Sequence, residues 1–215
     1  DIQPQVYRML QNSLMKGRLA HAYLFEGEKA TGKKEASIIL AKSLFCEVDN
    51  LQEVPCNKCT NCRRIDNENH PDVHVIEPDG LSIKKEQIQY LQEEFSKKGV
   101  ESSKKIYILV SADKMTVQAA NSLLKFLEEP QSDTLAILIT EQSQRIIPTI
   151  LSRCQIISFQ PLTSSILVKQ LMERGIEETT ASIVAELTNQ LDEAIQISSD
   201  DWFAQAQRKV LKLYE

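Results

Sequence analysis

Short apolar runs alternate with amphipathic patterns of helical spacing along the first three quarters of the chain. Runs of this kind are typical of strands buried in a sheet, and we expect such strands at 22–25, 73–76, 106–110, 135–139 and 155–159. Between them, apolar residues recur at the spacing of one helical face, and we expect helices at 33–45, 84–95, 117–127 and, as a short turn, 145–151. Strands that alternate with helices predict a parallel sheet with helices on both faces, which is an α/β fold.

The pattern changes after Pro161, where helical spacing continues without further strands. We expect the helices of this last part at 166–174, 180–187, 191–197 and 202–214. The change predicts two domains, an α/β domain over 1–160 and a small all-helical domain over 161–215. Residues 46–62 carry four cysteines among polar residues and Pro, which indicates an inserted loop with little core of its own.

Composition narrows the class of protein further. The chain has 215 residues, of which 42% are hydrophobic and 26% charged, and these values are typical of a globular protein. It contains no apolar run of the roughly 18 to 20 residues that cross a bilayer and no secretory signal pattern at its start. We therefore expect a cytoplasmic protein with no membrane partner. The net charge of −5 argues against a general nucleic-acid binder, so any DNA role must be local or shared.

The sharpest local motif is GEKATGKK at 27–34, which matches G-x-x-x-x-G-K between a predicted strand and a predicted helix. In such a loop Gly27 and Gly32 allow the turns, backbone N–H groups bind phosphates, and Lys33 reaches the terminal phosphates. Functional loops continue with a Ser or Thr whose hydroxyl binds Mg²⁺, whereas Lys34 stands here and cannot coordinate a cation. The motif predicts a phosphate loop with impaired metal binding; the alternative is a plain Gly-containing turn.

A second motif consists of Cys56-x-x-Cys59-x-x-Cys62, with Cys46 ten residues before it. Four closely spaced thiols in a protein without a secretory signal are typical of structural zinc, which binds four thiolates in a tetrahedron. Redox-active cysteines and a catalytic metal are the alternatives, and a catalytic metal keeps an open ligand position. The fifth thiol, Cys154, is expected to be a small buried residue.

The third signal is the pair of motifs NSLLKFLEEP at 121–130 and TILSRC at 149–154. Together with HAYLF at 21–25, the phosphate loop and the four cysteines, they make essentially the whole chain resemble the AAA+ clamp-loader subunits of bacterial DNA polymerase III. The resemblance implies an AAA+ sheet with an inserted zinc knuckle, a helical lid domain, and a collar domain beyond residue 215. It also implies partners: the gamma/tau motor subunits, the delta subunit and, through the complex, the sliding clamp and primer-template DNA.

Departures from the motor pattern distinguish the branches of this family. In the gamma/tau motor, the strand before the LEEP-containing motif ends in an Asp-Glu pair that holds Mg²⁺ and polarises the attacking water, whereas the matching positions here are Val110 and Ser111. The motor's sensor arginine is replaced by Asp192. With Lys34, these are three independent departures, and all of them remove groups that bind or process ATP. The chain therefore resembles the non-hydrolysing delta-prime branch, in which ATP and Mg²⁺ are not bound productively.

The resemblance also assigns a role to Ser152, Arg153 and Cys154. In this family the Ser-Arg-Cys motif projects an arginine finger into the ATP site of the neighbouring motor subunit, where a guanidinium stabilises charge on the transferring phosphoryl group. Without the motif, an arginine at this position is expected to be a surface residue paired with a carboxylate. The expected function is to help load the sliding clamp, without an activity of its own.

Two other classes of function remain open at this point. The chain is an active ATPase of the gamma/tau type if Lys33 binds phosphate and Asp113 or Glu141 takes over metal binding. It is a zinc-dependent DNA-binding module if the knuckle and local lysines bind phosphates, although the acidic net charge counts against this class.

Overall fold

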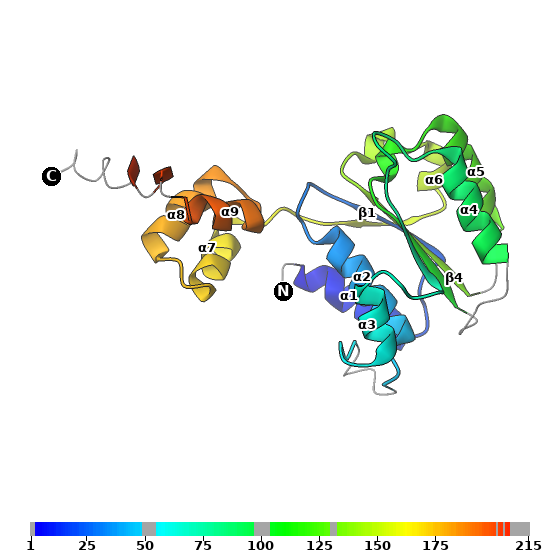
Figure 1. Ribbon diagram of the computed structural model, residues 1–215, viewed down its shortest axis with the longest axis horizontal. Coiled ribbons are helices and arrows are strands. Elements are labelled where there is room, and N and C mark those ends of the chain that lie inside the picture. The colour runs from blue at the N-terminus through cyan, green and yellow to red at the C-terminus, as the bar shows by residue number, and fades with distance from the viewer. Residues whose placement is uncertain are drawn as a thin grey trace. The chain divides into compact units, whose positions relative to one another are not determined.

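The computed structural model describes residues 3–48, 55–96, 104–129, 133–200, 202–203 and 205–206 (Figure 1). Its contacts divide the chain into two compact units. The larger unit holds residues 3–27 and 32–159, and the smaller unit holds 28–31 and the chain from 160 onward.

A five-stranded sheet forms the centre of the larger unit, in the order β2-β3-β4-β1-β5. Every strand pair is parallel, as the alternation of strands and helices predicts. The strands are β1 (Ala22–Glu26), β2 (Val73–Ile76), β3 (Lys105–Leu109), β4 (Thr134–Thr140) and β5 (Gln155–Ser158).

Side chains of the central strands alternate between two buried cores, because successive residues of a strand point to opposite faces. In β1, Ala22 and Leu24 belong to one core, whereas Tyr23 and Phe25 belong to the other. The strand is buried on both faces, which explains why its sequence is a continuous apolar run rather than an alternating one.

Helices cover both faces of the sheet, which confirms the predicted α/β architecture (Figure 1). One face packs against apolar residues of three helices, which are α4 (Lys85–Ser96), α5 (Val117–Glu128) and α6 (Pro148–Leu151). The opposite face packs against α1 (Pro4–Met15) and α2 (Lys33–Phe45). Two 3₁₀ turns, η1 (Ala112–Lys114) and η2 (Ser143–Arg145), follow β3 and β4.

Two helices lie where the sequence predicts none. α1 begins with Pro4 in its first turn and buries Val6 and Leu10, which lie one helical turn apart. α3 (Thr60–Asp66) lies in and just after the four-cysteine insertion and has seven residues, too few to reveal a helical period. It buries Cys62 and Ile65. Of these two, Ile65 belongs to the core of the sheet and lies beyond the insertion at 46–62.

The smaller unit is helical in its described part and has its own apolar core. Its helices are α7 (Ser164–Glu173), α8 (Glu178–Leu187) and α9 (Leu191–Ser198). They agree with three of the four helices expected after Pro161, and the fourth, at 202–214, lies largely outside the described residues. Within the described ranges, no helix combines the length and apolarity needed to cross a membrane.

Candidate functional site

The predicted phosphate loop connects β1 to α2, as its motif requires. Gly27 lies very close to the backbone of Phe159, in the segment that follows β5. A Cβ on Gly27 would meet the Phe159 carbonyl oxygen at 2.4 Å. Gly32 immediately precedes α2 with a φ of +86°, in the left-handed region that favours glycine. The backbone itself therefore favours glycine at both positions, and at Gly27 a side chain would also clash.

Lys33 does not extend away from the loop. Its Nζ donates a hydrogen bond of 2.8 Å to the carbonyl oxygen of Gly27, and the residue is 6% exposed. The side chain thus links the two ends of the loop. In this arrangement the ammonium is directed at the Gly27 carbonyl oxygen at the start of the loop.

Lys34, which stands where a functional loop has a metal-binding hydroxyl, pairs with two carboxylates. Its Nζ lies 2.8 Å from Glu77 Oε1 and 3.3 Å from Glu68 Oε1. The hydrogen bond to Glu77, supported by the charge of Glu68, raises the pKa of Lys34 above its ordinary value. This position therefore holds a carboxylate-paired ammonium, which has no lone pair to offer a divalent cation.

The end of β3 carries the two residues that replace the motor's Asp-Glu pair. Val110 directly follows the strand, and Ser111 has a φ of +55° at the start of η1. The nearby Asp113 carboxylate accepts a hydrogen bond of 2.7 Å from Thr140 Oγ1 and a longer one, of 3.4 Å, from the Glu141 backbone N–H. The two residues considered as substitute metal ligands, Asp113 and Glu141, are thus neighbours. Thr140, fully buried at the end of β4, is a contact that sequence analysis missed.

The four cysteines form one cluster. The sulfur atoms of Cys46, Cys56, Cys59 and Cys62 all lie within 4.8 Å of one another. In a tetrahedral site with Zn–S bonds of about 2.3 Å, the sulfurs are about 3.8 Å apart, so a small contraction brings these four into ligand geometry. The residues present therefore fit a metal ion of the kind that prefers four thiolates.

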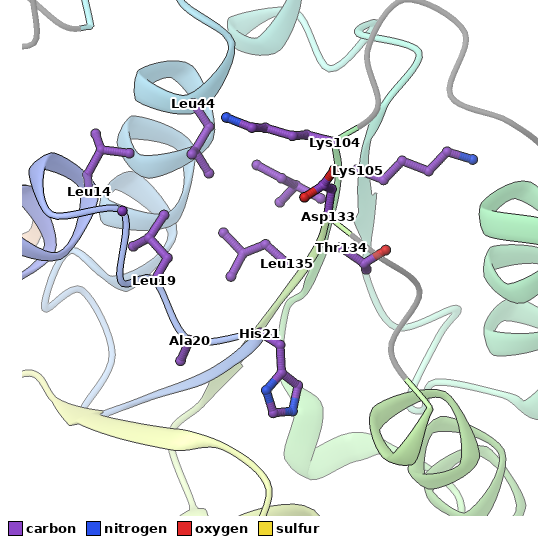
Figure 2. A pocket seen from close by; sticks show the side chains of 12 residues that line it. Leu14, Leu19, Ala20, His21, Leu44, Lys104, Lys105, Asp133, Thr134 and Leu135 are labelled. Carbon is purple, nitrogen blue, oxygen red and sulfur yellow. The ribbon is translucent and has the colours of Figure 1, made fainter.

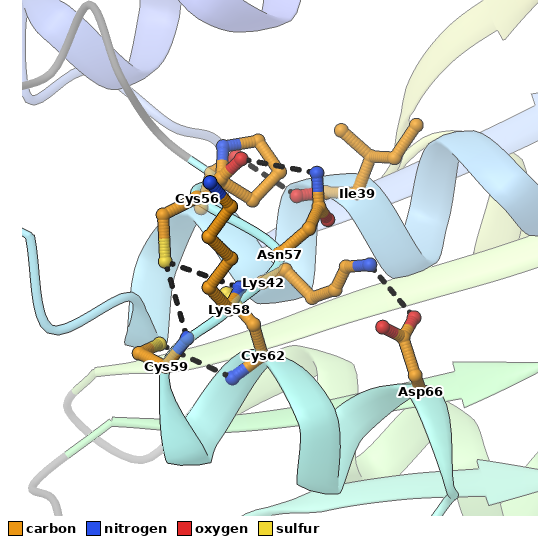
Figure 3. Close-up of polar contacts among 10 residues, drawn as sticks. Ile39, Lys42, Cys56, Asn57, Lys58, Cys59, Cys62 and Asp66 are labelled. Carbon is orange, nitrogen blue, oxygen red and sulfur yellow. Dashed lines mark hydrogen bonds and ion pairs between the residues drawn. The ribbon is translucent and has the colours of Figure 1, made fainter.

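Backbone N–H groups prepare this cluster to hold negative charge (Figure 3). Cys56 Sγ accepts from the N–H groups of Lys58 and Cys59 at 3.5 and 3.4 Å, and Cys59 Sγ accepts from Cys62 N–H at 3.4 Å. These N–H groups, first that of Lys58, lower the pKa of Cys56 to about 6. Burial raises the pKa of Cys62 to about 12, so this thiol needs a cation to ionise at neutral pH.

Contacts with α2 hold the cysteine cluster in position. Cys46 directly follows that helix, and Asn61 Nδ2 donates to the carbonyl oxygen of Phe45 at 2.9 Å. The Nζ of Lys42, a nearly buried residue, lies 2.7 Å from Asp66 Oδ1 at the end of α3 (Figure 3). Lys42 was not identified from the sequence, because a lysine inside a helix usually points to solvent.

Arg153 lies between α6 and β5, with its guanidinium on the surface. Nη2 is 2.7 Å from Glu128 Oε1, and Nη1 donates to the Thr149 carbonyl oxygen at 2.8 Å. Ser152 Oγ donates to the same carbonyl at 3.1 Å. The structure therefore brings Ser152 and Arg153 together with Glu128, the last residue of α5, which sequence analysis did not single out.

Two further residues named from the sequence lie apart from these groups. Cys154 is partly buried and packs against the core beneath α5 and α6, as expected for a small apolar residue. Asp192 is exposed in the first turn of α9, in the smaller unit.

A separate cavity of about 380 Å³ lies where β1, β3 and β4 begin, at the opposite end of the sheet from the phosphate loop (Figure 2). Its walls are mostly apolar and include Leu14, Leu19, Leu44 and Leu135, and the charged residues among them are Lys104, Lys105 and Asp133. None of the site residues predicted from the sequence lines it.

Comparison with known proteins identifies the fold class. A DNA polymerase III gamma subunit-related protein from Thermotoga maritima superposes with a TM-score of 0.54 and 22% identity, over 87% of this chain and 58% of that one. The RuvB Holliday junction branch migration motor of the same organism gives a TM-score of 0.58 and 15% identity, over 92% and 59%. These likenesses, with the parallel sheet and the helical part that follows it, confirm the predicted AAA+ fold.

Sequence comparison identifies the family. The family model described as DNA polymerase III, delta subunit, matches residues 2–163. The delta-prime subunit of DNA polymerase III from Bacillus subtilis is 55% identical over 215 residues, which is the whole of this chain and 65% of the relative's length. The chain therefore belongs to the DNA polymerase III delta-subunit family, and its resemblance to the delta-prime branch is confirmed.

Proposed function

We propose that the chain is part of a clamp-loader subunit that does not hydrolyse ATP itself and supplies an arginine to the ATP site of a neighbouring motor subunit. It assembles with gamma/tau and delta in the cytoplasm, and the complex loads the sliding clamp onto primer-template DNA. In this proposal residues 1–160 are the AAA+ domain, 161–215 are the lid domain, and a collar domain follows.

The observation that carries the non-hydrolysing part of the proposal is the ion pairing of Lys34. An ammonium held by Glu77 and Glu68 occupies the position of the hydroxyl that would bind Mg²⁺. Lys33 already donates to Gly27, and neither Val110 nor Ser111 offers a carboxylate. Phosphoryl transfer needs a metal and an oriented water, and these residues supply neither.

Binding of a fluorescent ATP analogue to the purified chain, with and without Mg²⁺ and alongside a turnover assay, tests this part. We expect weak binding that does not depend on Mg²⁺, and no hydrolysis. Tight, Mg²⁺-dependent binding with turnover would instead favour the ATPase alternative, in which Asp113 or Glu141 holds the metal.

The arginine part of the proposal is supported by the position and chemistry of Arg153. Its side chain is 33% exposed, so a partner subunit can reach it. A guanidinium remains charged at every physiological pH and matches the oxygens of a phosphoryl group. We propose that Arg153, next to Ser152, stabilises the transition state at the neighbouring motor's ATP site.

Substitution of Arg153 by Ala in the full-length protein, assembled with the motor and delta subunits, tests this role. We expect turnover at the adjoining motor site to fall by roughly 10³-fold or more, because arginine fingers contribute about 10³ to 10⁵ in rate. The matched control is Arg174→Ala, since Arg174 also donates to a carbonyl four residues earlier in its helix. Normal turnover by an intact Arg153→Ala complex would disprove the assignment.

For the cysteine cluster we propose one structural Zn²⁺ bound by Cys46, Cys56, Cys59 and Cys62. Four thiolates complete the tetrahedral shell of this ion and leave no position for a reacting water, so the site would stabilise the insertion rather than take part in a reaction.

A further inference from the structure

One ion pair joins the two sequence motifs that make this chain resemble clamp-loader subunits. Glu128 ends α5 within the NSLLKFLEEP motif, and Arg153 follows α6 within the TILSRC motif. Their Oε1 and Nη2 atoms are 2.7 Å apart, although 25 residues separate them in sequence. The carboxylate comes from a helix packed on the sheet, so the backbone that carries it is held in place near the arginine.

A second contact fixes the other terminal nitrogen of the same guanidinium. Nη1 donates to the Thr149 carbonyl oxygen at 2.8 Å and lies 3.4 Å from Ser152 Oγ. Two terminal nitrogens anchored on different partners determine the plane of the group. Since a guanidinium has five N–H donors, the Nε–H and the second N–H of Nη2 stay available to an incoming oxygen.

Stability alone does not account for this arrangement. The side chains of Arg153 and Glu128 are 33% and 45% exposed, and ion pairs at such exposure contribute little to folding. The ion pair does affect the orientation of Arg153. An arginine without a partner samples many rotamers, and only a few of them direct its donors toward a ligand. A carboxylate that restricts those rotamers in advance lowers the entropy lost when the transition state is bound.

We propose that Glu128 is a positioning residue, which holds the guanidinium of Arg153 in the orientation that meets the phosphoryl group in the neighbouring motor subunit. This inference rests on the proposed trans role of Arg153. Glu128 does not touch the reacting atoms in this proposal; it acts through Arg153.

The test compares Glu128→Gln with Glu129→Gln in the full-length protein, assembled with the motor and delta subunits. Glu129 is the adjacent exposed carboxylate, and among the described residues its side chain has no hydrogen bond or ion pair. We expect Glu128→Gln to lower kcat at the adjoining motor site about tenfold with KM for ATP unchanged, because positioning acts on the transition state and not on ATP binding. Glu129→Gln is expected to match the unaltered complex.

A double-substitution cycle separates positioning from a merely structural role. If Glu128 acts through Arg153, then Glu128→Gln has no further effect on kcat in a complex that already carries Arg153→Ala. Equal kcat for Glu128→Gln and Glu129→Gln, a higher kcat for Glu128→Gln, or an undiminished effect in the Arg153→Ala background would each overturn the inference. These results differ from failure of the trans role itself, in which Arg153→Ala alone would leave turnover unchanged.

Discussion

The two ends of helix α2 carry two candidate binding sites, and these sites differ in what their polar groups contact. At the amino end, Lys33 and Lys34 are held by the Gly27 carbonyl and by the carboxylates of Glu77 and Glu68. At the carboxyl end, four cysteine sulfurs converge on one point within 4.8 Å of each other. In the loop, the charged groups are paired with other groups of the chain. In the cysteine cluster, the potential metal donors surround a common centre.

This difference shows that a segment can have the backbone shape of a binding site without the free polar groups that bind a ligand. The lysines of the loop already have partners within the chain, and an ammonium offers no lone pair to a metal. Converging thiols gain from a cation, because the cation removes the cost of bringing negative sulfurs together. Helix α2 thus has the candidate phosphate loop at one end and four candidate metal donors at the other.

Of the substitutions at the two ends of α2, removal of the metal donors is expected to lower the free energy of unfolding most. We expect about one equivalent of zinc in the purified chain, lost in the double variant Cys56→Ser, Cys59→Ser. Since a structural metal contributes its binding energy to folding, the free energy of unfolding should fall by at least about 3 kcal/mol. Metal analysis and thermal unfolding on the same samples measure both quantities.

Cys154→Ser is the control for that experiment, because Cys154 lies outside the cluster and packs against the core. It should keep the zinc. A double variant that is as stable as the unaltered chain, or a chain purified without metal and equally stable, would remove the contrast between the two ends of α2.

A smaller loss of stability is expected at the amino end of α2. There, glycine substitutions change the backbone of the loop and leave its charged side chains in place. Gly27→Ala should lower the free energy of unfolding by about 3 kcal/mol, because the new Cβ would meet a backbone oxygen of Phe159 at 2.4 Å. Gly32→Ala should cost only about 1 kcal/mol, since it has a left-handed φ but nothing within 4 Å of its Cβ. Urea unfolding of both variants checks the order.

Equal stabilities for these two variants would mean that the loop does not need its close approach to Phe159, the residue that follows β5. The shape of the phosphate site would then depend on something other than the packing of Gly27 against Phe159.

The fold was predictable from the sequence wherever burial leaves a strong periodic signal. β1 and β3 are buried on both faces and therefore form continuous apolar runs, and α5 buries a wide stripe that includes Leu123 and Leu127. α3 was missed because a seven-residue helix leaves too few apolar positions to count, whereas the apolar residues of α1, such as Val6, Leu10 and Leu14, do recur at helical spacing. The strand order of the sheet was beyond reach too, since neighbours such as β1 and β5 are far apart in the chain.

The candidate sites divide in the same way. Cysteine spacing predicted a cluster because four ligands lie close together in sequence. The loop motif predicted that Lys33 stands where the loop meets the following helix. The partners that define each group's state come from distant segments: Glu77 for Lys34, Thr140 for Asp113 and Glu128 for Arg153. No local pattern encodes these pairs, because they arise only when the sheet brings its elements together.

The smallest change in stability and in ATP binding is expected from a substitution that makes the phosphate loop more similar to that of a gamma/tau motor. Lys34→Ser restores a hydroxyl at the metal position but should not create Mg²⁺-dependent turnover, because Val110 and Ser111 still lack carboxylates. Loss of a half-exposed ion pair should change the free energy of unfolding by less than about 1 kcal/mol. Lys29→Ser, which alters an exposed lysine of the same loop, is the control.

A fluorescent ATP analogue, titrated with and without Mg²⁺, measures the outcome for both variants. Two-fold or smaller differences between them would mean that the loop's chemistry was lost at several positions and that no single substitution restores it. Mg²⁺-dependent turnover by Lys34→Ser alone would mean the reverse: Asp113 or Glu141 would then be able to hold the metal, and Lys34 alone would keep this end of α2 inactive.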